Sequence, residues 1–437
     1  EFYAQTLRKA DTLLSPVSLL RSFKNSFKVF SFPFHRKYAI LAESRTDLTV
    51  QPLEKGGIIL ELTFDALVVG AGYAGGKRVL VLERRDHIGG NAYDRLDGAG
   101  VLIHQYGPHI FHTNNKRVFD WLSRFTVWRD YQHRVLANLP DGQGGRQTYP
   151  VPFNLTSLET AFGPAEGARL GEKLIAAYGA EKKVTILELR QARDPEIAAL
   201  ADYVYEHVFV HYTMKQWGQT PEEIDPNTTA RVPVFLSRDD RYFQDAYQGM
   251  PLEGYTVLFQ RMLDHPGITV ELGTDALKRL DLSEGRICLD GAEFSGPVIY
   301  TGQADELFAF RFGPLPYRTL DFRFETLEQD DFQGCGTVNY TVDEDYTRIT
   351  EFKHLTGQVK PGVTTIVKEY SRAFTGAPGE TPYYAIINPE NDRRYAQYRT
   401  EAERFPNLYL LGRLAEYKYY NMDAIAARAL ELAGLLT

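Results

Sequence analysis

Apolar and polar residues follow a new pattern from about Phe64 onward. Residues 67–69 form an apolar run, residues 70–75 are rich in glycine, and a second apolar run at residues 79–82 ends on Glu83. A strand, a glycine turn and a second strand that ends on an acidic residue are typical of a nucleotide-binding α/β fold. A folded unit is therefore predicted to begin near residue 64.

Further along the chain, the pattern changes from strand to helix. Residues 125–153 partly alternate between apolar and polar positions around an Asp-Gly turn, which indicates a hairpin. Asp194 and Pro195 form a good helix start, and apolar residues then recur at helical spacing as far as Tyr212. A helical region is therefore expected to follow the hairpin.

Short strands with turn signals return at residues 269–387, and a helix is predicted for residues 423–436. This order predicts an α/β fold in which a Rossmann-like, dinucleotide-binding domain carries an inserted helical domain and an antiparallel β-sheet domain. The predicted boundaries are 64–125 with 250–305 and 385–437 for the dinucleotide-binding domain, 154–231 for the helical domain, and 126–153 with 306–384 for the sheet domain.

Residues 1–63 differ from the rest of the chain, because they are rich in serine and basic around residues 21–37. They lack the charged, apolar and cleavage regions of a signal peptide, and we expect that the written start is not the natural one. A basic amphipathic membrane anchor at residues 26–42 is one interpretation. An artefact of cloning or of gene prediction is the favoured one, so residues 1–63 are predicted to be foreign or peripheral.

Length, charge and cysteine content exclude several classes of protein. A chain of 437 residues is long enough for two or three domains, and its net charge of -8 disfavours a nucleic-acid partner. No run of about 18 apolar residues is present that could span a membrane. The two cysteines, Cys288 and Cys335, support neither a disulfide framework nor a zinc site, and a reduced, cytoplasmic protein is expected.

The glycine motif predicts a pyrophosphate site. Gly70, Gly72 and Gly75 have the GxGxxG spacing that lets the backbone approach a pyrophosphate, and Glu83 is placed to bind the adenosine ribose. However, Gly75 and Glu83 are only eight positions apart, whereas about 20 residues, including a helix, separate the glycines from the acid in a complete motif. The first helix is therefore missing. Either its residues were left out and the numbering was closed up, which we favour, or the gene product is damaged.

A second glycine signature, Arg-Arg-Asp-His-Ile-Gly-Gly-Asn, occupies residues 84–91. It resembles the signature that packs against the flavin side of the cofactor in the FAD-dependent oxidoreductase and amine-oxidase-like superfamily. The resemblance implies that the first domain binds FAD. The implied cofactor-binding residues here are Gly70, Gly72, Gly75, Glu83, Arg84, Gly90 and Asn91.

Later motifs extend the resemblance over nearly all of residues 64–437. In order, they are residues 106–113 (YGPHIFHT), 149–154 (YPVPFN), 212–218 (YTMKQWG), 346–354 (YTRITEFKH), 368–372 (KEYSR), 383–384 (YY), 412–414 (GRL) and 419–423 (YYNMD). In this combination they resemble the bacterial UDP-galactopyranose mutases, flavoenzymes of galactofuranose and cell-wall biosynthesis.

That resemblance assigns roles to individual residues. Tyr212 would stack on uracil, with Trp217 nearby and Phe209 lining the pocket, although ordinary core residues at a helix end remain an alternative. Arg231 and Arg348 would bind the substrate diphosphate, because a guanidinium forms paired, charge-assisted hydrogen bonds with phosphate oxygens.

The remaining assignments concern the diphosphate, the flavin and the sugar. Tyr384 and Tyr419, joined by Tyr242, would donate hydroxyl groups to the diphosphate. His112 would lie next to the flavin ring, with a satisfied core histidine as the alternative. Residues 225–249 resemble the family's mobile substrate loop. Cofactor-side or sugar-side positions are implied for Arg318, Arg413, Asn421 and Met422.

The resemblance implies an isomerase whose cofactor supplies the difficult chemistry, since the sequence presents no Ser/His/Asp group, acid pair or metal cluster. Reduced FAD would attack the anomeric carbon of UDP-galactopyranose through N5 and expel UDP, and the sugar would reclose as a furanose. The implied catalytic residues are Arg231, Arg348 and His112, with the arginines stabilising the departing charge. NAD(P)H or another external reductant would first reduce the FAD, and a homo-oligomer of open size is expected.

Two alternatives stay open. The first is an FAD-dependent oxidase or desaturase of the same superfamily, which would share residues 70–90 but need not hold two arginines and several tyrosines for a diphosphate. The second is an inactive remnant, which the missing helix and the unusual N-terminal segment make plausible. Bound FAD would exclude the remnant.

Overall fold

The computed structural model describes residues 48–52, 58–62, 66–69, 78–141, 144–218 and 233–436. The chain divides into two units, Glu1–Thr63 and Phe64–Thr437. In the first unit, β1 (Leu48–Pro52) pairs antiparallel with β2 (Ile58–Leu62). The predictions for residues 1–47, including the membrane anchor, lie outside the described residues.

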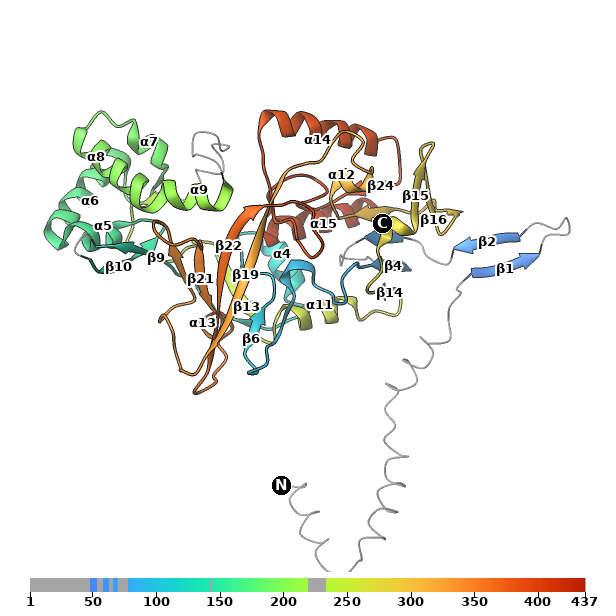
Figure 1. Ribbon diagram of the computed structural model, residues 1–437, viewed down its shortest axis with the longest axis horizontal. Coiled ribbons are helices and arrows are strands. Elements are labelled where there is room, and N and C mark those ends of the chain that lie inside the picture. The colour runs from blue at the N-terminus through green and yellow to red at the C-terminus, as the bar shows by residue number, and fades with distance from the viewer. Residues whose placement is uncertain are drawn as a thin grey trace, which may run out of the picture. The chain divides into compact units, whose positions relative to one another are not determined.

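A five-stranded parallel sheet organises the Rossmann-like part of the second unit (Figure 1). In spatial order its strands are β14 (Ile268–Glu271), β4 (Val79–Leu82), β3 (Ala66–Val69), β18 (Val298–Tyr300) and β24 (Leu408–Leu410). Every residue of β4 is buried, which explains its continuously apolar sequence. The predicted C-terminal helix is confirmed as α15 (Met422–Leu436), which packs on this sheet through Ile425, Ala429 and Leu432.

The connection between β3 and β4 is unusually short. The two strands are parallel neighbours, with Ala66 opposite Val79. Only the nine residues 70–78 join them, whereas a parallel crossover usually takes a dozen residues or more and contains a helix. The predicted glycine motif lies at residues 70–75, outside the described residues. The strand pairing is that of a Rossmann fold, but the connection is too short for the usual helix.

The second large sheet of this unit has seven strands, in the order β10-β9-β20-β21-β22-β19-β23. Its strands are β9 (Val135–Pro140), β10 (Arg146–Val151), β19 (Tyr317–Leu327), β20 (Thr337–Tyr340), β21 (Arg348–Glu351), β22 (Thr364–Ala373) and β23 (Tyr384–Ala385). Strands β9 and β20 pair parallel, and the other neighbours pair antiparallel. β9 and β10 confirm the predicted hairpin.

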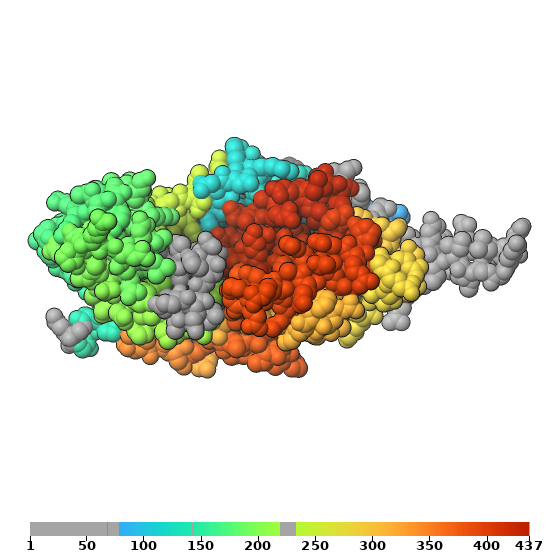
Figure 2. Space-filling model, turned by 90° about the horizontal axis from the view of Figure 1, so that it is seen from above, coloured from blue at the N-terminus to red at the C-terminus, as the bar shows by residue number. Residues whose placement is uncertain are grey.

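Helices follow the hairpin directly. They are α5 (Leu155–Phe162), α6 (Pro164–Tyr178), α7 (Ile186–Arg190), α8 (Pro195–Val204) and α9 (His211–Trp217), with the π-helix η2 (Tyr205–Val210) between α8 and α9. The predicted helix start is confirmed, because the Asp194 side chain accepts hydrogen bonds from two backbone N–H groups and Pro195 follows it. In Figures 1 and 2 these helices (green) gather at one end of the unit, apart from the C-terminal segments (red).

Shorter elements complete the second unit. The strands are β5 (Asp94–Leu96), β6 (Leu102–His104), β7 (Phe111–Thr113), β8 (Trp128–Arg129), β11 (Lys183–Val184), β12 (Val234–Phe235), β13 (Tyr247–Pro251), β15 (Leu280–Ser283), β16 (Arg286–Leu289) and β17 (Ala292–Glu293). The helices are η1 (Gly90–Ala92), α4 (Lys116–Leu122), α11 (Tyr255–Leu263), η3 (Ala276–Lys278), α12 (Ala304–Leu307), α13 (Phe352–Thr356) and α14 (Pro389–Ala402). Among the described residues, no helix combines the length and apolar character needed to cross a membrane.

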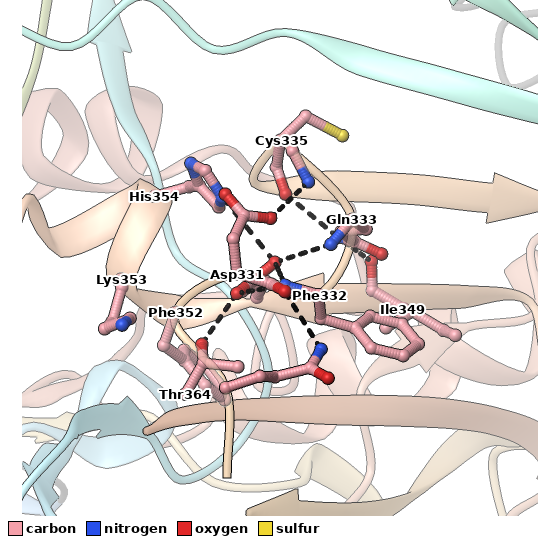
Figure 3. A network of polar contacts seen from close by, with 12 residues as sticks. Asp331, Phe332, Gln333, Cys335, Ile349, Phe352, Lys353, His354 and Thr364 are labelled. Carbon is pink, nitrogen blue, oxygen red and sulfur yellow. Dashed lines mark hydrogen bonds and ion pairs between the residues drawn. The ribbon is translucent and has the colours of Figure 1, made fainter. Parts of the chain in front are cut away.

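A network of polar contacts organises the loop before β20 (Figure 3). Buried Glu351 accepts hydrogen bonds from the backbone N–H groups of Phe332 and Gln333 and from the Thr364 hydroxyl. The Nε2 atom of His354 lies 2.9 Å from Asp331 and 3.6 Å from Glu351. These three side chains are close enough to share a metal ion, but both Glu351 oxygens are already bonded to the loop. The cluster therefore serves as a structural network.

His104, at the end of β6, is buried in a neutral form. Its Nδ1 atom accepts a hydrogen bond from the backbone N–H of His109 at 3.0 Å, which an imidazolium cannot do. Burial lowers the pKa of His104 to about 4, compared with about 6.5 for an unfolded chain. Between these pH values His104 is protonated in the unfolded chain but neutral in the folded protein. His104 alone therefore removes about 3 kcal/mol from the free energy of unfolding as the pH falls.

We therefore expect His104→Gln to flatten the pH dependence of unfolding. As the pH falls from 6.5 to 4, the wild-type free energy of unfolding should decrease more steeply than that of the variant. The difference in slope corresponds to about one proton that the wild-type chain takes up on unfolding. Urea unfolding followed by circular dichroism at several pH values measures this slope. The exposed His265 offers a control, because His265→Gln should keep the wild-type slope. Equal slopes for His104→Gln and wild type would contradict the neutral assignment.

Candidate active site

A cavity of about 2050 Å³ lies in the second unit. Its walls come from the parallel sheet, β7, β20 to β22 and the segments around residues 374–384 and 411–436. Single ligand sites usually measure about 300–1,000 Å³. This cavity is therefore large enough for two ligands side by side.

One part of the cavity wall is apolar. Val68, Val79 and Ile299 of the parallel sheet line it, together with Leu432 and Leu436 of α15. This part adjoins β3 and β4, where the crossover helix of a complete dinucleotide motif packs. Apolar surface is thus open to the cavity at the place where the sequence lacks a helix.

Two neighbouring arginines after β4 have different environments. Arg84, which the sequence assigns to the cofactor, is half exposed and forms an ion pair with Glu306 at 2.8 Å. Arg85 donates from Nη2 to Asn91 at 2.8 Å and lies 4.3 Å from the centre of the Tyr106 ring. Its buried Nη1 has no hydrogen-bond partner among the described residues. Arg85 lines the cavity and is therefore a candidate for binding an anionic ligand, which the sequence analysis missed.

Glu83 and a glycine turn shape the same end of the cavity. Glu83 is buried, and its carboxylate accepts a hydrogen bond from the Arg85 backbone N–H at 2.9 Å. Gly89 and Gly90 have φ angles of 87° and 55°, in the left-handed region that favours glycine. A Cβ atom on Gly89 would lie 3.2 Å from the Phe259 ring. The turn therefore requires glycine where the backbone borders the cavity.

Strand β7 places His112 in the cavity wall. Its Nδ1 atom lies 2.9 Å from an oxygen of Asp245, and its ring stacks on Phe243 with 3.5 Å between ring centres. Asn114 donates to the other Asp245 oxygen at 2.8 Å. Because a carboxylate can only accept a hydrogen bond, the proton of a neutral imidazole lies on Nδ1, and Nε2 is then the acceptor nitrogen. The carboxylate of Asp245 thus orients His112.

Arg348 is the central cation of the cavity. The register of β21 and β22 places it opposite Glu369, and its Nε lies 3.2 Å from a Glu369 oxygen. Its Nη2 donates to the Tyr212 hydroxyl at 3.2 Å. Burial raises the pKa of the Glu369 carboxyl, against the opposing effect of Arg348. The Arg348 Nε is thus engaged by one Glu369 oxygen, whereas the other Glu369 oxygen has no hydrogen-bond partner among the described residues.

Two tyrosines and an arginine form the adjoining wall. The rings of Tyr384 and Tyr419 stack with centres 6.2 Å apart, and Arg413 lies 4.4 Å from the centre of the Tyr419 ring. Burial raises the pKa of Tyr384 to about 12, so its hydroxyl remains protonated at neutral pH and can donate a hydrogen bond. The predicted residues Tyr242, Asn421 and Met422 line the same cavity.

Seven predicted residues are not among the described residues of the cavity wall, and three of them, Gly70, Gly72 and Gly75, belong to the glycine motif outside the described residues. Phe209 belongs to the hydrophobic core of the helical region. The ring centres of Trp217 and Tyr384 lie 5.5 Å apart. Arg318 is buried beneath α9, where its guanidinium donates hydrogen bonds to backbone carbonyls. Arg231 lies outside the described residues.

Known proteins resemble this chain over most of its length. A family model described as UDP-galactopyranose mutase matches residues 207–419, and one described as an NAD(P)-binding Rossmann-like domain matches residues 67–125. The UDP-galactopyranose mutase of Mycoplasma pneumoniae is 35% identical over 388 residues, covering 85% of this chain and 96% of the relative. The chain belongs to the UDP-galactopyranose mutase family. A dTDP-fucopyranose mutase of Escherichia coli is also 35% identical, over 84% of this chain and 97% of that relative.

Solved structures show the fold of this mutase family member. A crystal structure of reduced UDP-galactopyranose mutase matches with a TM-score of 0.61 and 16% identity, over 85% of this chain and 93% of that one. A putrescine oxidase double mutant matches with a TM-score of 0.53 and 13% identity, over 85% and 98% of the two chains. The predicted mutase family and the predicted α/β fold with a Rossmann-like domain are thereby confirmed.

Three polar residues of the site were missed by the sequence analysis, namely Arg85, Asp245 and Glu369. Glu369 left the clearest signal, because it is an acidic residue in the KEYSR motif at residues 368–372, in the middle of β22. Its burial and its pairing with Arg348 depend on strand register, which residue spacing alone does not show. Asp245 is distant from His112 in sequence, so only the fold brings the two together.

Proposed function

We propose that this chain interconverts UDP-galactopyranose and UDP-galactofuranose. The observation that carries the proposal is the contact between Arg348 and Tyr212 in a cavity that Tyr384 and Tyr419 also line, within a chain of the mutase family. A guanidinium beside several phenol hydroxyls suits a diphosphate, because all of these groups donate hydrogen bonds to phosphate oxygens.

FAD is the proposed cofactor, and the described residues at one end of the cavity suit it. Arg85 offers a buried N–H without a partner, and the turn at Gly89 and Gly90 keeps side chains away from the cavity. Glu83, Asn91 and Met422 line the same space. When bound and reduced by NAD(P)H or another external reductant, FAD would supply N5 as the nucleophile for the anomeric carbon.

The chain's own residues would bind, orient and neutralise the substrate. We assign the diphosphate to Arg348 and Arg231, which stabilise the charge that builds up on the departing UDP. Tyr384 and Tyr419 add hydroxyl donors, and Tyr212 stacks on the uracil ring. We assign His112, which Asp245 orients, to a position beside the flavin.

A second candidate substrate is a dTDP-linked fucose. The E. coli dTDP-fucopyranose mutase matches this chain at the same 35% identity as the UDP-galactopyranose mutase of M. pneumoniae. The diphosphate is common to both nucleotide sugars, so the arginines and tyrosines would serve either one. The base and the sugar would decide between them.

Chromatographic assays of the full chain test these proposals. UDP-galactofuranose and dTDP-fucofuranose are incubated separately with the FAD-loaded protein, with and without dithionite. We expect conversion of UDP-galactofuranose to the pyranose form only in the reduced sample. Faster conversion of the dTDP sugar would favour the second candidate, and a protein that retains no flavin and converts neither sugar would contradict both.

We also propose that the protein is a homo-oligomer in the cytoplasm. Free Cys288 and Cys335 support a reducing compartment. Light scattering coupled to gel filtration measures the oligomeric state directly, and a monomer at working concentration would contradict this part of the proposal.

A further inference from the structure

Arg318, on β19, is a buried cation whose partners are all uncharged. Its Nε donates to the Gln216 carbonyl at 3.2 Å, and its Nη2 donates to the Lys215 carbonyl at 3.1 Å and to the Ser371 hydroxyl at 3.2 Å. Ser371 in turn donates to the Gln216 carbonyl at 2.7 Å. These carbonyls belong to the last turn of α9, where a helix leaves acceptors unpaired and carries partial negative charge. The helix end therefore acts as the counter-charge for Arg318.

Gly218, which ends α9, leaves room for this contact. It has a φ angle of 66° in the left-handed region. A Cβ atom at this position would lie 2.6 Å from Nη1 of Arg318. The guanidinium therefore occupies the space that any larger residue would need.

Lys215 makes a connection in the opposite direction, from α9 to the sheet. Its Nζ donates to the backbone carbonyls of Tyr340 at 2.5 Å, Glu344 at 3.0 Å and Tyr346 at 3.4 Å. Three acceptors use all three protons of an ammonium group. These carbonyls lie at the end of β20 and in the connection to β21, which begins with Arg348.

Together, these contacts fasten α9 to the sheet at two points near the proposed substrate site. Tyr212 lies on the same short helix, and its hydroxyl accepts a hydrogen bond from Arg348. Neither Lys215 nor Arg318 is among the described residues of the cavity wall. We infer that Lys215 and Arg318 are positioning residues that set the placement of Tyr212 relative to Arg348, and so determine substrate affinity without touching substrate. The inference rests on the proposed function, which gives Tyr212 and Arg348 a common ligand.

Binding of UDP to the FAD-loaded full chain tests this inference. We expect Lys215→Met to raise the Kd for UDP and the KM for UDP-galactofuranose about 10- to 100-fold, because α9 loses three charge-assisted hydrogen bonds. Since the cofactor contacts are elsewhere, kcat should change less than about threefold and the FAD content should stay constant. Isothermal titration calorimetry with UDP and steady-state kinetics give the two sets of values.

Matched variants separate positioning from general stability. Arg318→Lys keeps a cation and should bind UDP more tightly than Arg318→Met. Lys173, which pairs with Asp194 at 2.8 Å on the outside of the helical region, offers a control, and Lys173→Met should keep the wild-type Kd. An unchanged Kd in Lys215→Met would overturn the inference, as would a loss of kcat and FAD content at constant KM.

Failure of the proposed function gives a different result. A wild-type chain that binds no UDP would contradict the function but leave the fastening of α9 measurable by hydrogen exchange. In that case, faster exchange of residues 211–217 in Lys215→Met than in Lys173→Met supports the positioning role. Equal exchange in the two variants overturns it.

Discussion

Replacement of Arg348 by alanine is expected to lower kcat/KM by a factor of about 10³, the loss that follows removal of one strong transition-state donor. Its Nε lies 3.2 Å from a Glu369 oxygen, and its Nη2 donates to the Tyr212 hydroxyl in the cavity. Removing the cation also leaves Glu369, which is 2% exposed, buried without its counter-charge. That loss costs about 3 kcal/mol or more of stability. Kinetics must therefore be measured together with thermal unfolding.

A double variant separates the two effects of losing Arg348. Arg348→Met combined with Glu369→Gln removes the unpaired charge, so it should recover stability but not activity. Arg286 offers a control, because it pairs with Glu284 at 2.8 Å and neither residue lines the cavity. Arg286→Ala should keep kcat/KM within about twofold. Recovery of activity in the double variant would show that Arg348 only balances Glu369.

Adding a helix to the short β3–β4 connection is expected to raise FAD affinity more than tenfold. About a dozen helix-forming residues, inserted between Gly76 and Lys77, would give this connection the length of a usual crossover. A helix N-terminus then presents N–H donors and a positive dipole to the pyrophosphate, a contribution of up to about 2 kcal/mol. The same helix would cover the apolar wall that includes Val68 and Val79. Flavin absorbance after gel filtration and a fluorescence titration with FAD measure the gain.

A flexible insert of equal length is the matched control for the added helix. Glycine and serine residues lengthen the connection but provide neither an aligned dipole nor an apolar face. Their variant should retain no more FAD than the unaltered chain. If the unaltered chain already binds FAD stoichiometrically through gel filtration, the short connection suffices and the missing helix is not needed for cofactor binding.

Local patterns predicted the elements that local physics controls. The helix start at Asp194, the β9–β10 hairpin and the terminal helix α15 were all predictable, because capping, turn residues and apolar spacing act over a few positions. Motif order also indicated the family, which the comparisons confirm. In each case the signal lies within one short stretch of chain.

Contacts between residues that are distant in sequence could not be predicted from the sequence alone. The charges of Arg348 and Glu369 are evident in sequence, but their pairing depends on the register of β21 and β22. Arg318 shows why a motif position alone is insufficient, since its guanidinium meets the end of α9 from another part of the chain. A buried arginine can satisfy a ligand or a helix end equally well. Only the fold distinguishes these two possibilities.

The length of the π-helix η2 sets the rotation of α9 about its axis, and thereby the direction of Tyr212 at the substrate site. It stands between α8, whose apolar residues pack in the helical core, and α9, which carries Tyr212. Each residue of a helix turns the chain by about 100°, so one residue more or fewer in η2 would swing Tyr212 away from Arg348. Homologues that bind the same ligand should therefore tolerate changes of residue type in this segment far better than changes in its length.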